Sequence, residues 1–130
     1  MITERIWARL MRNIAEPENE QACWVWTRRC DREGYGLINV HVPGLRRNAT
    51  LKAHIVAWII LNANDHIDSA DDLYLAYKEL TLSRLQLDHG CVCGCCIRPD
   101  HLEPVTPVVN SRLRDSRRKA RTQTAFLAYV

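Results

Sequence analysis

The 130-residue chain lacks an apolar run long enough to cross a bilayer, because its longest such run, residues 55–61, falls far short of the about 20 residues that a spanning helix needs. It also lacks an apolar leader, since charged Glu4 and Arg5 follow Met1 almost directly. We find no internal repeat and no low-complexity linker, and the length suggests one domain over residues 1–130. We therefore expect a small globular protein that works in the compartment where it is made.

A strong excess of one charge is also missing, since the net charge is only +3. The basic residues are instead gathered in two groups. One consists of Arg46, Arg47 and Lys52. The other lies in the C-terminal extension, residues 112–130, where a single acid, Asp115, accompanies Arg112, Arg114, Arg117, Arg118, Lys119 and Arg121. Such groups can neutralise phosphates, although a solvated helix face would explain the extension equally well.

Cysteine, by contrast, is plentiful for so short a chain. The six cysteines are Cys23, Cys30, Cys91, Cys93, Cys95 and Cys96, so that four of them fall within six residues. An even number of cysteines is typical of disulfides in secreted proteins, and buried apolar residues or reactive thiols are further interpretations. Because the chain shows no export signal and His101 lies close by in sequence, a metal site is the favoured interpretation.

Apolar periodicity and turn residues predict alternating helices and strands. We expect helices over residues 3–14 and 71–82, and strands over 23–27 and 35–42 that could pair as a hairpin. Residues 50–61 are expected to form a short strand to about Lys52 and then a helix that carries His54. A strand over 84–87 enters the cysteine-rich segment, and Pro107 suits the first turn of a last helix that runs through Asn110 into the basic extension.

Two sets of metal ligands of different hardness stand close together within residues 87–110. Asp88 and Asn110 offer hard oxygen ligands that suit magnesium or a similar cation. His89 could act as a general base near neutral pH. The soft or borderline ligands are evenly spaced as C-x4-C-x4-H, and a fourth ligand would complete a closed tetrahedral zinc site: Cys91, Cys96 and His101. Phosphodiester hydrolysis needs such a base and cation together with basic side chains that hold the polyanion.

The same segment resembles the core of the HNH endonucleases in their H-H-N form. The resemblance rests on Asp88-His89, on Pro99-Asp100-His101-Leu102-Glu103, and on Val105-Thr106 followed by Asn110. The zinc spacing is similar to that of the His-Cys box homing endonucleases, through His89, Cys91, Cys96 and His101. The front half of the HNH proteins common in phage genomes is matched by Cys23-Trp24-Val25-Trp26, Gly34-Tyr35-Gly36 and Ala53-His54. The resemblance covers residues 23–112, with an unmatched stretch near 65–84.

The resemblance implies an α+β fold, a small ββα-metal (HNH, or His-Me finger) domain with a structural zinc and flanking helices. It implies a metal-dependent DNA endonuclease, with His89 as the general base and a divalent cation such as Mg²⁺ held by Asp88 and Asn110. The structural zinc would be bound by Cys23, Cys91, Cys96 and His101. Cys30 competes with Cys23 for the fourth position, and Cys93 or Cys95 could displace Cys91 or Cys96.

Several roles stay open at this point. His54 is either a core histidine or a residue that faces the scissile phosphate. Arg98, where many relatives carry Asn, is one of the candidate DNA contacts, with Arg46, Arg47, Lys52, Arg112, Arg114, Arg117 and Arg118. Simple solvation explains these basic residues as well.

The rival functions are a non-catalytic zinc module that binds nucleic acid, and a redox or metal-handling protein built on the cysteines. The apolar end, residues 122–130, could pack on the core or on a partner chain in a homodimer. The resemblance places the protein in the cytoplasm of a bacterial or phage-infected cell.

Overall fold

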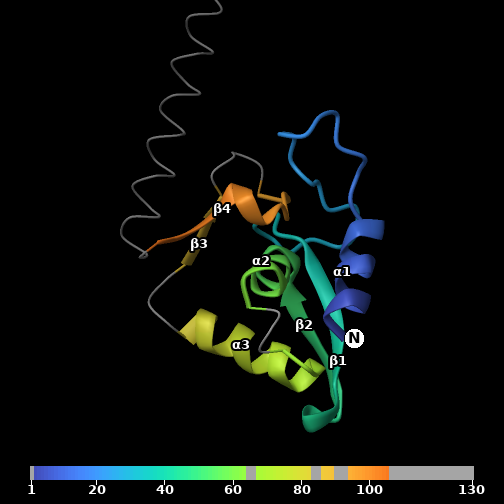
Figure 1. Ribbon diagram of the computed structural model, residues 1–130, viewed down its shortest axis with the longest axis vertical. Coiled ribbons are helices and arrows are strands. Elements are labelled where there is room, and N and C mark those ends of the chain that lie inside the picture. Colours follow the sequence, from blue (N-terminus) through green and yellow to red (C-terminus); the bar gives the residue numbers. More distant parts are fainter. Residues whose placement is uncertain (1, 64–66, 83–85, 90–93, 106–130) are drawn as a thin grey trace, which may run out of the picture.

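The computed structural model describes residues 2–63, 67–82, 86–89 and 94–105, with residues 63, 86–89 and 103–105 described by the course of the backbone alone (Figure 1). These residues form both helices and short strands. In chain order they are α1 (Ile2–Arg12), β1 (Leu37–Val42), η1 (Pro43–Leu45), β2 (Arg47–Lys52), α2 (Ala53–Ala63), α3 (Ala70–Leu82), β3 (Gln86–His89), η3 (Pro99–His101) and β4 (Leu102–Val105). The predicted α+β class is therefore confirmed.

The first sheet is an antiparallel hairpin of β1 and β2, in register from Leu37 opposite Lys52 to Val42 opposite Arg47. Alternate residues of β1 are buried: Ile38, Val40 and Val42. The connection is the short 3-10 turn η1, which ends at Arg46 in the left-handed region at φ 55°.

The predicted pairing of residues 23–27 with 35–42 is wrong. β2 takes the place beside β1, because the short turn brings it back next to β1 at little cost in loop entropy. Residues 23–27 contribute only isolated bridges, one of which joins Val25 to Cys96. A further isolated bridge, between Cys30 and Gly36, links the 28–35 turn to the start of β1.

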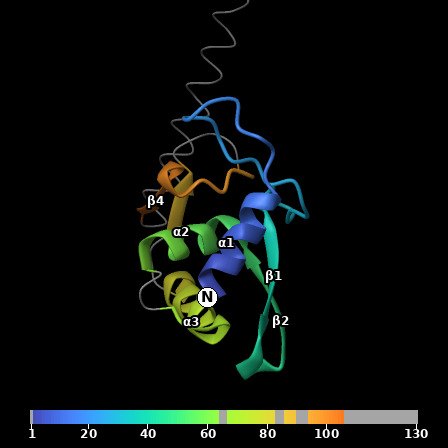
Figure 2. The same ribbon diagram turned by 45° about the vertical axis from the view of Figure 1, so that its right-hand side comes forward.

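Helix α2 forms the centre of the core. It begins directly after β2, as the sequence predicts, and its residues are buried on nearly every side, including Ala53, Val56, Ala57 and Ile59. Both views of the molecule show α2 between the β1–β2 hairpin and the β3–β4 pair (Figures 1 and 2). A helix that is apolar all round is stable only in such a position, where other elements cover it from both sides.

The flanking helices cover the same core. α1 buries Ile6 and Leu10, and α3, found close to its predicted range of 71–82, buries Leu73 and Tyr77. The Tyr77 hydroxyl accepts a hydrogen bond of 3.0 Å from the Lys52 amide at the end of β2. None of the helices in the described part of the chain combines the length and apolar character that a membrane crossing requires.

The second sheet is the antiparallel pair β3–β4, in register from Gln86 opposite Val105 to His89 opposite Leu102. β3 is two residues further along the chain than the predicted strand at 84–87. The predicted last helix from Pro107, with the basic extension and the apolar end, lies outside the described residues. The antiparallel pair is compatible with a ββα arrangement, which stays a prediction together with its helix.

Candidate metal centre

A backbone pairing between distant parts of the chain builds this site. The Trp26 amide donates to the Cys95 carbonyl (3.0 Å), and the Ile97 amide donates to the Trp24 carbonyl (2.9 Å). These bonds flank the bridge between Val25 and Cys96 and fix the two segments side by side. As a result, Cys23 is carried to the segment that leads from Cys96 into η3.

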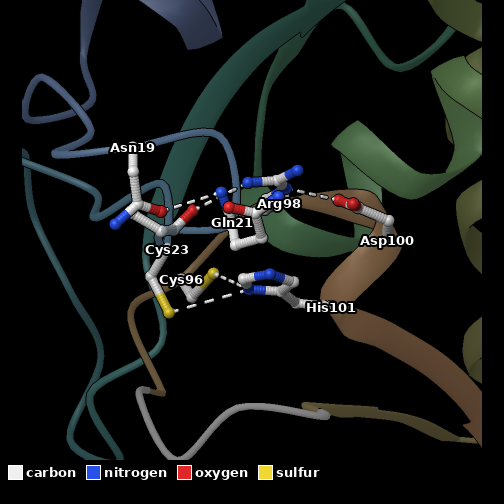
Figure 3. A network of polar contacts seen from close by, with 8 residues as sticks. Asn19, Gln21, Cys23, Cys96, Arg98, Asp100 and His101 are labelled. Carbon is white, nitrogen blue, oxygen red and sulfur yellow. Dashed lines mark hydrogen bonds and ion pairs between the residues drawn. The ribbon is translucent and has the colours of Figure 1, made fainter.

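Three ligand side chains meet there: Cys23, Cys96 and His101 (Figure 3). The His101 Nδ1 atom lies 3.7 Å from the Cys23 Sγ and 3.5 Å from the Cys96 Sγ. All three ligand atoms lie within 4.8 Å of one another. This cluster could hold a metal ion.

The spacing of the cluster is compatible with zinc. Sulfur and nitrogen atoms on one tetrahedral zinc, at about 2.3 Å and about 2.0–2.1 Å from it, lie about 3.6 Å apart. The two measured sulfur-to-nitrogen distances, 3.7 and 3.5 Å, fall on either side of that value. Burial is also suitable, since Cys96 is fully buried and the other two side chains are half-buried. Burial of a negatively charged thiolate costs free energy unless a positive charge compensates it, and a metal ion supplies that charge.

Arg98 ties the ligand loop together. Its Nη1 donates to the Ala22 carbonyl (3.0 Å), next to Cys23, and its Nε donates to the Asp100 carboxylate (2.6 Å), next to His101 (Figure 3). The guanidinium also lies over the Trp24 ring, 5.6 Å from its centroid. Arg98 thus bridges the segments that carry two of the three ligands.

These contacts also give Arg98 a structural task that the sequence did not reveal. Its side chain is 16% exposed, against 61% for Asp100, so most of it is committed to the loop rather than to solvent. The hydrogen bond from Arg98 lowers the pKa of Asp100 below its ordinary value, and the same bond raises the pKa of Arg98. Arg98 therefore supports the ligand loop through hydrogen bonds to Ala22 and Asp100.

The backbone of His89 lies close to this cluster. His89 ends β3 and is opposite Leu102, the residue that follows His101, and the preceding Asp88 is opposite Glu103. Opposed residues of an antiparallel pair have Cα atoms about 4.5–5.5 Å apart. Asn110, the other predicted cation ligand, lies outside the described residues, as do Cys91 and Cys93.

The other predicted site residues take up different places. Cys30 is exposed and its thiol contacts the Arg28 carbonyl, away from the cluster, whereas Cys95 is half-buried beside it. His54 is buried, 4% exposed, in the first turn of α2, with its ring centroid 5.1 Å from that of Tyr35.

The basic residues predicted to contact DNA differ in how exposed they are. Arg46 and Arg47 are exposed at the hairpin turn, whereas Lys52 is half-buried with its ammonium group 4.7 Å from the Tyr35 ring centroid. Outside the described residues lie Arg112, Arg114, Arg117 and Arg118.

No protein-family model matches the chain, and comparisons with curated proteins and with solved structures give no match either.

Proposed function

We propose that this chain is a metal-dependent DNA endonuclease of the HNH type, with His89 as its general base. The observation that carries the proposal is the position of the metal-ligand cluster at the foot of the β3–β4 pair. His101, one of the three residues that could hold the metal, directly precedes Leu102, and Leu102 is opposite His89 in the β3–β4 pair. The HNH resemblance links the same two features in sequence, a zinc-bound loop and a base on the adjoining strand.

The zinc would serve the fold rather than the reaction. Cys23, Cys96 and His101 would hold it, and Cys91 is the fourth ligand that the resemblance names. The loop between β3 and η3 has few apolar residues, so metal binding would supply the free energy that keeps the loop folded. A rigid loop fixes the end of β3, and a general base must be held within hydrogen-bond reach of the water that it deprotonates.

The reaction proposed is hydrolysis of a phosphodiester bond. His89 takes a proton from a water molecule, whose oxygen bonds to the phosphorus while the bond to the 3′ oxygen breaks. The departing oxygen takes up a proton, which leaves a 5′-phosphate and a 3′-hydroxyl. A divalent cation on Asp88 and Asn110, when bound, would stabilise the negative charge on that departing oxygen.

The test is plasmid cleavage with and without magnesium by the wild type and by His89→Ala. Both proteins must carry equal zinc and melt at similar temperatures, so that the fold is matched. We expect nicking or linearisation that needs magnesium and is lost in the variant. A wild type that binds DNA but does not cut it with any divalent metal would instead favour the non-catalytic zinc module. Equal cutting by both proteins would contradict the role of His89.

A metal assay separates the remaining rival. A redox or metal-handling protein would exchange or release its metal when the thiols are oxidised or reduced under mild conditions. The endonuclease should keep one zinc per chain throughout.

We further propose DNA as the partner and the cytoplasm of a bacterial or phage-infected cell as the location. A homodimer would put two such sites on one duplex, which gel filtration of the full chain would reveal.

A further inference from the structure

A groove runs along helix α1 where the helix faces strand β1. Two adjoining hollows form it, of about 570 Å³ and about 680 Å³, and Arg9 lines both. The first hollow is also lined by Arg28 and Arg29, and the second by Arg5 and Arg12. The described residues that line the groove thus include five arginines and one acid, Asp68, although the whole chain has a net charge of only +3.

The spacing of the α1 arginines follows from the helix period. Residues 5, 9 and 12 are four and three positions apart, so they share one helix face, opposite in kind to the buried face of Ile6 and Leu10. At 1.5 Å per residue, Arg5 and Arg12 are separated by about 10 Å along the axis. One strand of B-form DNA presents about three phosphates over the same rise, at about 3.4 Å each.

The groove is held in shape by hydrogen bonds that leave most of its positive charge available. A guanidinium nitrogen of Arg9 donates to the Asn39 carbonyl of β1. The Arg29 carbonyl accepts from the Leu37 amide (2.9 Å) and from the Trp26 ring nitrogen (3.2 Å), which fixes the turn that carries the two further arginines. Within the part of the chain that the structure describes, none of the five arginines forms an ion pair.

We propose that this groove binds the phosphodiester backbone of DNA, at a site separate from the β3–β4 pair. That the polyanion is DNA rests on the proposed function. Helix α2 lies between α1 with β1 and the β3–β4 pair in both views (Figures 1 and 2), so a groove along α1 would hold a stretch of backbone that flanks the cleavage point. Trp26 connects the groove to the segment that carries Cys96, since it lines the first hollow and its amide donates to the Cys95 carbonyl. Contacts of this kind add affinity and position the substrate without reading its sequence.

The test compares two double variants with a matched control. Arg5→Gln with Arg12→Gln, and Arg28→Gln with Arg29→Gln, each remove two exposed charges from the groove. The control, Arg32→Gln with Lys78→Gln, removes two exposed charges outside it. The full-length, zinc-loaded proteins are first matched by thermal melting. Binding of a short fluorescein-labelled duplex is then followed by anisotropy without magnesium, over a range of salt concentrations.

We expect each groove variant to bind about 30-fold more weakly than wild type at 0.15 M salt, with a slope of log K against log salt that is shallower by about 2. The control should shift neither quantity appreciably. Groove variants that bind like the control would overturn the inference while leaving the endonuclease proposal intact. If the wild type does not cleave DNA but the groove variants still bind it more weakly, the endonuclease proposal alone would be overturned. If the wild type binds vesicles rich in phosphatidylserine but no duplex, the proposal that the groove binds DNA would be overturned.

Discussion

Replacement of Cys96 by alanine separates a metal ligand from an ordinary buried cysteine. The Cys96 side chain is fully buried, and its sulfur lies 3.5 Å from the His101 Nδ1. If the thiol only packs in the core, its loss removes about 1 kcal/mol from the free energy of unfolding. For a domain of this length that lowers the melting temperature by about 3–5 °C and leaves metal content unchanged.

A metal ligand gives a much larger effect. A bound ion that is present at 1,000 times its dissociation constant stabilises the folded state by about 4 kcal/mol. Loss of one ligand from the cluster should therefore lower the melting temperature by about 12 °C or more and remove the zinc. A chelator should lower the melting temperature of the wild type by a similar amount, and it should have no further effect on Cys96→Ala.

The assay is zinc content per chain by elemental analysis, together with calorimetry with and without chelator. Cys30→Ala is the matched control, because that cysteine is exposed and lies outside the cluster. It should keep its zinc and melt like the wild type. A Cys96→Ala protein that still holds one zinc per chain, and that the chelator still destabilises, would refute the assignment of this ligand.

Two more substitutions test how the loop and the fold are held. Gly36→Ala should lower the free energy of unfolding by about 1–3 kcal/mol, because an added Cβ would lie 2.5 Å from the Trp26 ring. In the control, Gly94→Ala, the added Cβ meets its nearest atom at 3.9 Å, so this variant should melt close to the wild type. Equal melting temperatures of the two variants would contradict the close approach of Gly36 to Trp26. Arg98→Ala should weaken zinc retention in a competition with a chelator by about tenfold or more, since it removes the hydrogen bond to the Ala22 carbonyl. Unchanged retention would mean that Arg98 does not support the ligand loop.

Local patterns in the sequence predicted where the helices α2 and α3 begin. The change from strand to helix at Lys52 and Ala53 was predicted because a long apolar segment begins there. The helix that became α3 was predicted within one residue of its observed start, Ala70. In both cases the apolar period and the flanking turn residues are read from neighbours in the chain.

The failure of the predicted hairpin has a different origin. Trp24 and Trp26 alternate like strand residues, yet their backbone partners are Ile97 and Cys95, some seventy positions further along the chain. Alternation shows that a segment can pair but does not identify the partner. β1 pairs with β2 rather than with residues 23–27, because the short turn after Val42 returns β2 beside β1.

The metal cluster was predictable as a set of residue types and only partly as a geometry. The spacing of Cys96 and His101 indicates a site, but the choice of Cys23 over Cys30 depends on the long-range pairing of Val25 with Cys96. The role of Arg98 was hidden for the same reason, since its partner at Ala22 is equally remote in sequence. The one sequence signal that could have indicated this role is an arginine between two predicted metal ligands, with an acid two positions later.

The most direct test of the central claim is the chemistry at the cut ends. An end-labelled DNA duplex is incubated with magnesium and with wild type or His89→Ala, each carrying one zinc per chain, and Cys30→Ala serves as the mutational control. We expect products with 5′-phosphate and 3′-hydroxyl ends from the wild type and the control, and none from His89→Ala. Products of the same kind and amount from His89→Ala would contradict its role as the base, and no magnesium-dependent product from the wild type would contradict the endonuclease proposal.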